Sequence, residues 1–359
     1  MTPDGSFADI PAEVRRRVDG GERVALLLLD ALGLRFLHRH DDHPLLRRLR
    51  VTPLRSQFPS TTTAHVTTIH SGQPVQEHGL YEWNVFEPAL GQIICPLRFN
   101  FAGSDVPGDL EGRLSPSALL SGATLYETLG ARSFVLQPHA IAGSPFTRLA
   151  TRGATVHGFE QPADGLRALS DLIASVDGPA YAFLYWDEID RTGHERGPDS
   201  PEFDHAARAA LDAVAEALGD LRDVTVLLTA DHGQVGVSPD RVDYLDELWP
   251  ELPSMLALRR PAGSSRDAFL HVRPEHVDTV IAGLSARLDD RARVLPAREL
   301  FDDPGPRLTA RLGQVAVLAA PGREVWLRSA PGNERWFQGQ HGGLDPAETE
   351  TYLAEVRPE

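Results

Sequence analysis

Hydrophobic residues in this chain gather in short unbroken runs, and stretches with helical periodicity separate those runs. Unbroken apolar runs of this length are typical of strands that are covered on both faces. We expect strands at residues 24–29, 134–136, 154–157, 181–186 and 224–229. Helices are expected at residues 10–20, 116–130, 163–176 and 201–218. This alternation predicts an α/β fold with a doubly wound, mostly parallel sheet flanked by helices.

The pattern changes after residue 240. A strand at 264–272 and a helix at 275–288 predict a small α/β subdomain at residues 241–299. The core is then expected to comprise residues 1–240 and 300–359.

Three further stretches have less regular patterns. Residues 85–115 are rich in Phe, Pro and Gly, which predicts a loop or flap over a site. Residues 315–318 and 324–327 are expected to form a late hairpin around the turn former Pro321-Gly322. A final helix is expected at the C-terminus.

Length and composition place the chain in the globular class. It has 359 residues, of which 42% are hydrophobic and 24% charged. The longest apolar run, Val24–Leu29, is far shorter than the roughly 20 residues that span a bilayer. The first nine residues have no basic region and no apolar segment of their own, so we expect a cytoplasmic protein without a membrane partner.

Charge and residue usage exclude several chemistries. A net charge of −16 argues against a nucleic-acid polymer as partner, because phosphate backbones require a basic surface. The single cysteine, Cys95, excludes an intramolecular disulfide and a thiolate metal cage. All 35 basic residues are arginine, which excludes Schiff-base chemistry and a phosphate-loop lysine. A small-molecule substrate remains.

The segment from Phe58 to Gly72 has an unusual density of hydroxyl groups. Pro59 and the capping residues Ser60 or Thr61 predict a helix N-terminus there. A hydroxyl at such an end faces free N–H groups, where a phosphate or a developing alkoxide is stabilised. A threonine here is therefore a candidate nucleophile. An ordinary threonine-rich capped helix is the alternative.

Potential metal ligands follow three of the apolar strands, and one more histidine lies late in the chain between glycines. Because the carboxyl ends of parallel strands meet at one edge of a sheet, these residues are expected to converge. They are Asp30, Asp190, His194, Asp231, His232 and His341. Three carboxylates and three imidazoles suit Zn²⁺, and also Mn²⁺ or Fe²⁺. Taken singly, each is better explained as a turn or loop residue, and only their joint occurrence favours a metal site.

The motifs LLLLDALG, FPSTTTAHVTTIHSG with EHG, DRTGHERGP, TADHG and GQHGG together resemble the alkaline phosphatase superfamily. The resemblance is to its nucleotide pyrophosphatase/phosphodiesterase branch, the type I phosphodiesterases, and it extends from Val24 to the His341 segment. The third motif is the most specific.

The resemblance implies that Thr62 is the nucleophile, with Thr61 as the fallback. It also implies two zinc ions, one held by Asp30, Asp231, His232 and Thr62, the other by Asp190, His194 and His341. Asn84 would donate to a phosphate oxygen, although this match requires a one-residue insertion. His65 and His70 match no ligand of the family, and packing or a hydrogen bond behind the site is their expected role.

The implied activity is hydrolysis of a phosphodiester or nucleotide pyrophosphate bond through a phospho-threonine intermediate. A phosphomonoesterase or phosphomutase is the alternative. A monoester has a second phosphate anion that needs extra positive charge, which Arg191, Arg196 or Arg266 would supply if they reach the site. A catalytically silent metal- or nucleotide-binding protein is the alternative from another class.

Overall fold

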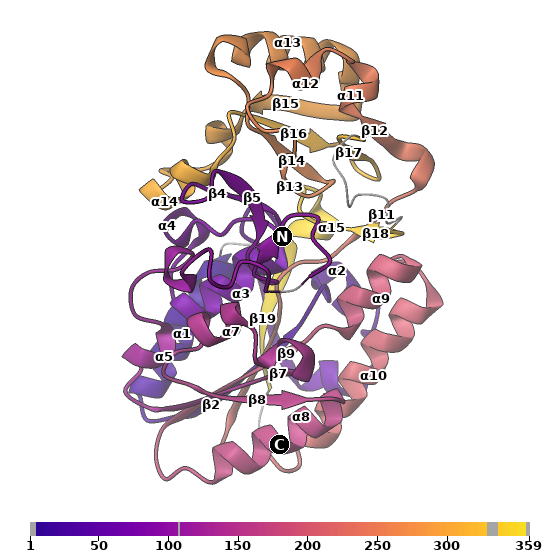
Figure 1. Cartoon of the computed structure of the whole chain (residues 1–359). Helices are drawn as coiled ribbons and strands as arrows, with labels where there is room; N and C mark the ends of the chain where they lie inside the picture. Colours follow the sequence, from indigo (N-terminus) through magenta and orange to yellow (C-terminus); the bar gives the residue numbers. More distant parts are fainter. Residues whose placement is uncertain (1–4, 107, 329–336, 357–359) are drawn as a thin grey trace.

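The computed structural model describes residues 5–106, 108–328 and 337–356, and its largest element is an eight-stranded sheet in the lower part of Figure 1. The strand order is β1 (Gly5–Ser6), β3 (Leu49–Arg55), β19 (Glu350–Val356), β10 (Thr225–Ala230), β2 (Arg23–Leu29), β9 (Ala180–Trp186), β7 (Arg132–Pro138) and β8 (Thr155–Phe159). The five strands from β10 to β8 are parallel to one another, which confirms the predicted doubly wound, mostly parallel sheet.

Helices cover both faces of this sheet, and β2 shows why. Ala25, Leu27 and Leu29 pack into the cluster beneath α8 (Pro162–Ala174) and α10 (Pro201–Ala217). The alternate residues of β2 face the opposite cluster, beneath α1 (Ile10–Asp19) and α3 (Thr62–Ser71). Successive side chains point to opposite faces of a strand, so a strand covered on both sides must be apolar at every position.

The prediction of a final helix is wrong. Only α15 (Pro346–Thr349) is helical, and β19 follows it directly. This strand inserts antiparallel between β10 and β3. Its buried residues Thr351, Tyr352 and Ala354 pair with strands that are distant in sequence, and this pairing outweighs any local helical preference.

The upper part of Figure 1 is a second α/β unit. Its sheet has the order β13 (Ala262–Gly263), β14 (Asp267–Leu270), β16 (Val315–Ala319) and β15 (Ala292–Pro296), and α13 (Val277–Leu288) packs on it. The unit therefore takes in β16, which lies outside the expected subdomain at 241–299.

The expected late hairpin is wrong as well. Both edges of β16 are already paired, one with β14 and the other with β15. The next strand, β17 (Glu324–Trp326), pairs in parallel with β12 (Val242–Tyr244) instead. A strand as apolar as β16 is best buried in the middle of a sheet.

Two other stretches are more ordered, or less helical, than expected. Residues 85–115, of which residue 107 lies outside the described residues, contain a three-stranded sheet of β4 (Val85–Glu87), β5 (Gln92–Cys95) and β6 (Asn100–Phe101). The helix expected at 116–130 is reduced to the 3₁₀ turn Pro116–Ala118 and to α5 (Leu125–Thr128), which begins at a capping box of Thr124 and Glu127.

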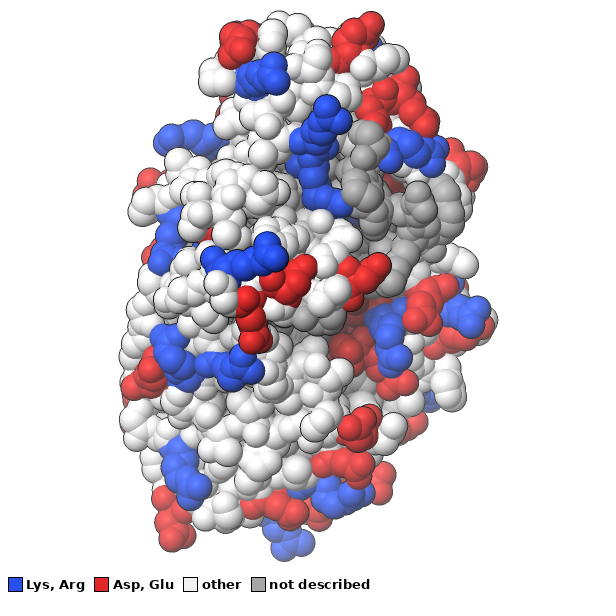
Figure 2. All heavy atoms as spheres, in the orientation of Figure 1, with Lys and Arg blue, Asp and Glu red and all other residues white. Residues whose placement is uncertain are grey.

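The remaining α-helices and strands are short connections, apart from α9. They are α2 (Leu34–His38), α4 (Val75–His78), α6 (His139–Ala142), α7 (Pro145–Ala150), α9 (Glu188–Arg196), β11 (Val235–Gly236), α11 (Leu245–Leu248), α12 (Leu252–Met255), α14 (Pro306–Arg311) and β18 (Gly339–Gln340). On the face drawn in Figure 2, arginine side chains are scattered among acidic ones. Among the described residues, none of the helices combines the length and apolar character needed to cross a membrane.

Candidate active site

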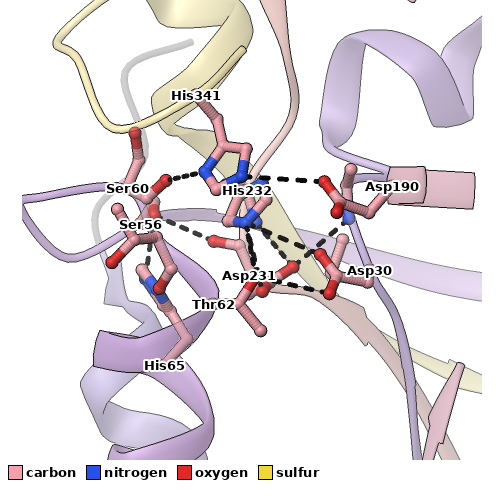
Figure 3. Close-up of polar contacts among 12 residues, drawn as sticks. Asp30, Ser56, Ser60, Thr62, His65, Asp190, Asp231, His232 and His341 are labelled. Carbon is pink, nitrogen blue, oxygen red and sulfur yellow. Dashed lines mark hydrogen bonds and ion pairs between the residues drawn. The ribbon is translucent and has the colours of Figure 1, made fainter. Parts of the chain in front are cut away.

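Three neighbouring strands of the main sheet deliver acidic residues to one edge. Asp30 follows β2, Asp231 follows β10, and Asp190 lies in α9 just beyond β9. In open parallel sheets this carboxyl edge is where ligands bind. Figure 3 shows the three carboxylates grouped around the rings of His232 and His341.

We call Asp30, Asp231 and His232 the inner set. His232 Nε2 lies 3.5 Å from Asp30 Oδ1 and 3.3 Å from Asp231 Oδ2. All three side chains are almost completely buried. Asp30 Oδ1 and Asp231 Oδ2 have no hydrogen-bond partner among the described residues. Buried carboxylate oxygens are costly without one, so this arrangement fits a bound cation.

We call Asp190, His194 and His341 the outer set. Asp190 and His194 lie four residues apart on α9, and their Oδ2 and Nε2 atoms are 3.4 Å apart. His341 comes from the loop after β18, and its Nε2 lies 3.7 Å from Asp190 Oδ1. These side chains are 13–17% exposed, so the outer set faces solvent more than the inner set does.

All three imidazoles are oriented by their second nitrogen. The Nδ1 atom of His194 lies 2.7 Å from the Gly339 carbonyl, that of His341 lies 2.9 Å from the Ser60 carbonyl, and that of His232 lies 3.1 Å from its neighbour's carbonyl. Nδ1 therefore donates to a carbonyl in each ring, and Nε2 faces the carboxylates. Metal-ligating histidines are typically held in this way.

Burial and like charge set the pKa values of the inner carboxyls. Burial raises the pKa of Asp30 well above its usual range, and the nearby Asp231 adds to this. Burial also raises the pKa of Asp231 to about 7. Burial lowers the pKa of His232, so its imidazole is neutral. A positive ion among these groups would relieve the repulsion between the carboxylates.

The outer carboxylate behaves in the opposite way. Burial acts to raise the pKa of Asp190, but the charge of His194 outweighs it and the pKa is lowered. The ligand atoms of Asp190, His194 and His341 all lie within 4.8 Å of one another, and the same holds for Asp30, Asp190 and His232. Each of these groups therefore has the donor atoms to hold a metal ion, and Asp190 belongs to both.

Thr62 is the first residue of α3 and its hydroxyl faces the inner set. Its Oγ1 atom lies 3.4 Å from Asp30 Oδ2 and 3.2 Å from His232 Nε2. The Thr61 hydroxyl is buried and donates to the Tyr81 carbonyl at 3.0 Å. Of the two threonines considered from the sequence, only Thr62 meets the cluster.

Asn84 lies at the start of β4, beside the second sheet. Its Nδ2 atom donates to the Gly263 carbonyl at 3.2 Å, and the two residues also form a backbone bridge. A role as donor to a phosphate oxygen would require this bond to be given up.

Several residues that support the site were not singled out from the sequence. Gln234 donates from Nε2 to Asp190 Oδ1 at 2.6 Å, and the Tyr185 hydroxyl donates to Asp30 Oδ2. The Ser60 hydroxyl donates to the Gly343 carbonyl at 3.1 Å. Gln234 directly follows the Asp-His-Gly motif, and Ser60 was considered only as a helix cap, so both lie beside signals in the sequence.

His65 and His70 both lie in the buried interior of α3, where different partners hold them. His65 Nδ1 is 2.6 Å from the Thr61 carbonyl, and its Nε2 accepts from the backbone N–H of Gln57 at 2.9 Å. His70 Nδ1 contacts the Tyr126 hydroxyl at 2.7 Å, further along the helix. His65 thus supports the N-terminus of α3, where Thr62 lies.

The main sheet thus gathers a cluster of acidic and imidazole side chains at its carboxyl edge. Residues 24–344 match the family model described as type I phosphodiesterase / nucleotide pyrophosphatase, and the chain belongs to that family. The family resemblance inferred from the sequence is thereby confirmed.

Curated relatives are similar over parts of their length. Ectonucleotide pyrophosphatase/phosphodiesterase family member 3 of Rattus norvegicus is 25% identical over 206 residues, which is 55% of this chain and 22% of the rat protein. An uncharacterized pyrophosphatase/phosphodiesterase of Schizosaccharomyces pombe is 25% identical over 242 residues, 63% of this chain and 47% of the yeast protein. The aligned part of this chain thus spans less than half of either relative.

Solved structures share the fold over nearly the whole chain. An inactive variant of murine ectonucleotide pyrophosphatase/phosphodiesterase 5, in complex with AMP, has a TM-score of 0.72 at 18% identity and covers 93% of this chain and 87% of its own. Phosphonoacetate hydrolase from Sinorhizobium meliloti, in complex with phosphonoacetate, has a TM-score of 0.68 at 17% identity and covers 94% and 90%.

Proposed function

We propose that this protein is a two-metal hydrolase that cleaves phosphodiester or nucleotide pyrophosphate bonds through a phospho-threonine intermediate on Thr62. The observation that carries the proposal is the contact of the Thr62 hydroxyl with Asp30 and His232 at a helix N-terminus. Nucleotide substrates are supported by the family's description and by the AMP bound to the murine neighbour.

The inner set would hold one divalent ion and the outer set a second, Zn²⁺ being the best match to mixed carboxylate and imidazole donors. Two such ions would supply Lewis-acid stabilisation of the oxygens around phosphorus. The chain itself supplies the oriented lone pairs. The Nδ1 atoms of these histidines face backbone carbonyls, which leaves Nε2 as the binding atom, although Asp190 raises the pKa of His194 and its Nε2 proton must be released first.

Thr62 would attack phosphorus with its Oγ1 atom, and the bond to the leaving oxygen would break. Asp30 Oδ2, at 3.4 Å, is the nearest carboxylate oxygen to accept a hydrogen bond from the Thr62 hydroxyl before attack. Water then attacks the same phosphorus and regenerates the threonine. Thr62 is the first residue of α3, and the free N–H groups of a helix N-terminus would stabilise charge on the phosphate oxygens.

The arginines support a diester over a monoester substrate. A monoesterase needs additional positive charge for the second phosphate anion. Arg266 is buried and donates to Glu348 and to the Ala320 carbonyl, so its guanidinium is engaged elsewhere. Arg191 and Arg196 are exposed on α9. A phosphomonoesterase or phosphomutase is therefore the second choice.

The test compares Thr62→Ala with Thr61→Ala as the matched control. Hydrolysis of bis-p-nitrophenyl phosphate should fall by about five orders of magnitude, or to background, in the first variant. In the second it should fall far less, because the Thr61 hydroxyl bonds to backbone. Metal content, measured by mass spectrometry, should stay near two ions per chain in both.

Retained turnover by Thr62→Ala would remove the nucleophile assignment. A higher rate on p-nitrophenyl phosphate than on the diester would favour the monoesterase. Metal-loaded wild-type protein that hydrolyses neither compound, nor any nucleotide diester or pyrophosphate, would indicate a silent binding protein.

A further inference from the structure

A second acidic pair lies in the interior, outside the inner and outer sets. Glu82, between α4 and β4, and Asp267, the first residue of β14, both have no exposed surface. Their carboxyl groups face each other within hydrogen-bonding range. Two carboxylates so placed repel each other and lose their hydration.

Of the four carboxylate oxygens of Glu82 and Asp267, only two accept hydrogen bonds from described residues. Glu82 Oε2 accepts from the backbone N–H of Trp83, and Asp267 Oδ1 accepts from the N–H and the hydroxyl of Ser264 at 3.2 and 2.8 Å. Glu82 Oε1 and Asp267 Oδ2 are buried and have no partner among the described residues. A buried carboxylate oxygen without a donor or cation costs several kcal/mol, on the order of a lost charged hydrogen bond or more.

No basic side chain compensates the pair within the described part of the chain. Burial raises the pKa of Glu82 to about 7, and burial with the charge of Glu82 raises that of Asp267 further. A hydrogen bond between the two carboxyl groups lowers the pKa of Glu82 and raises that of Asp267, and bonds from Ser264 and backbone N–H groups act after it. Arg266, although adjacent in sequence, turns away to Glu348.

The oxygens converge against the backbone of Gly342. A methyl group on Gly342 would lie 2.9 Å from Ser264 Oγ, 3.0 Å from Glu82 Oε1 and 3.1 Å from Asp267 Oδ1. The backbone φ of Gly342 is +120°, so glycine is required here on both counts. The His341 carbonyl lies 3.5 Å from Ser264 Oγ and adds another oxygen to the group.

We propose that Glu82, Asp267 and Ser264 form a binding site for a hard divalent cation, Ca²⁺ being the best match. The donors are all oxygen, with neither imidazole nor thiolate, and Ca²⁺ accepts carboxylate, hydroxyl and carbonyl oxygens in flexible geometry. Mg²⁺ matches less well because it retains several waters. A divalent ion balances both carboxylates, whereas one shared proton leaves a buried negative charge.

The site joins three segments that are distant in sequence. Glu82 leads into β4, Asp267 begins β14, and Gly342 follows His341 of the outer set. A cation here would fasten the loop of His341 to the second sheet. The inference stands apart from the proposed reaction, since it requires neither Thr62 nor a phosphate substrate.

The test uses the full-length protein, freed of metal and then loaded with two equivalents of Zn²⁺. Ca²⁺ is added, excess is removed by buffer exchange, and bound calcium is measured by mass spectrometry. We expect one Ca²⁺ per chain and a rise in Tm of about 5 °C at saturating Ca²⁺. The double variant Glu82→Gln/Asp267→Asn, with amides of the same shape, should lose both effects.

Asp190→Asn is the reciprocal control, because it alters the outer set and should keep the calcium while losing zinc. Equal calcium uptake by the wild type and the double variant would overturn the proposal, since uptake would then reflect the acidic surface. No calcium uptake and no change in Tm of the wild type would also overturn it and would assign a shared proton to the pair. Because the wild type alone gives that answer, the test remains decisive if the double variant fails to fold.

Discussion

The inner set has two carboxylates and one imidazole, the outer set has one carboxylate and two imidazoles, and the fold supports the two sets differently. The inner set of Asp30, Asp231 and His232 follows two central strands directly and is almost fully buried. The outer set is 13–17% exposed and combines a helix with the loop that contains His341. Rigid strand ends therefore hold one set, while the other depends on contacts between separate segments.

Electrostatics follow the same division. The inner carboxyls have raised pKa values because they are buried together, whereas the charge of His194 lowers that of Asp190. In the metal-free protein, the inner set is a source of instability and the outer carboxylate is stabilised by its own histidine. The inner set therefore gains the most from a bound cation, and the outer set is the side more exposed to solvent.

The largest expected effect comes from exchanging one carboxylate in each set for its amide. Asp231→Asn and Asp190→Asn should each lower diester hydrolysis by about a thousandfold, because several kcal/mol of charge stabilisation depends on the bound ions. In the metal-free protein at pH 8, however, Asp231→Asn should raise Tm and Asp190→Asn should lower it.

The signs follow from the shifts. A carboxyl whose folded pKa is raised, such as Asp231 at about 7, costs stability as pH rises from about 4, its usual value, through 7. A carboxyl whose folded pKa is lowered, such as Asp190, contributes stability above its usual pKa and loses it only in acid. Melting curves from pH 5 to 8 in chelator test this. Parallel decreases in both variants at pH 8 would contradict the contrast.

A smaller effect is expected from removing one support of the outer set. Gln234→Met keeps the length of the side chain but loses the Nε2 donor to Asp190 Oδ1. Such support behind a metal ligand is worth about 10- to 100-fold in metal affinity or activity. In calorimetric titration, the affinity for the second equivalent of zinc should fall by this factor, and the affinity for the first should not change.

Gln314→Met is the matched control, since the Gln314 side chain accepts a bond from Val272 in the second sheet. An equal loss in both variants would assign the effect to general destabilisation. If Gln234→Met lowers the affinity for both equivalents of zinc, the inner and outer sets are not supported independently of each other.

The same contrast explains which features the sequence could predict. Strand-end ligands such as Asp30 and Asp231 can be predicted because an unbroken apolar run ends at each. The parallel pairing of β2 and β10 then brings both residues to the same edge of the sheet. The signal at Pro59 predicts a helix N-terminus with a candidate threonine, and the family resemblance selects Thr62 within it. These are local patterns combined with one general property of parallel sheets.

Features that depend on distant pairing were missed. The strand β19 was expected to be a helix, because nothing near Tyr352 signals that β10 and β3 leave a place for it. Gln234 and Tyr185 reach Asp190 and Asp30 across 44 and 155 residues of sequence. The pairing of Glu82 with Asp267 is of the same kind. Such contacts are determined by the completed fold rather than by any neighbouring residue.

The smallest expected effect tests the support behind the inner set. His65 donates to the Thr61 carbonyl, and the Ser56 hydroxyl at its Nε2 donates in turn to the Asp231 carbonyl. Burial lowers the pKa of His65 to about 4, so the ring is neutral and acts through these bonds rather than through charge. His65→Phe keeps an aromatic ring against Phe7 but loses the bonds.

We expect His65→Phe to lower kcat about tenfold with little change in KM, because a small displacement of the attacking oxygen costs rate rather than binding. His70→Phe makes the same chemical change further along α3, where His70 contacts Tyr126. It should leave kcat within about twofold, because a buried aromatic ring is kept at this position and no contact with the inner set is lost. If both variants lose kcat equally, the helix as a whole rather than the His65 bonds positions Thr62, and the inner set would be no more rigidly supported than the outer one.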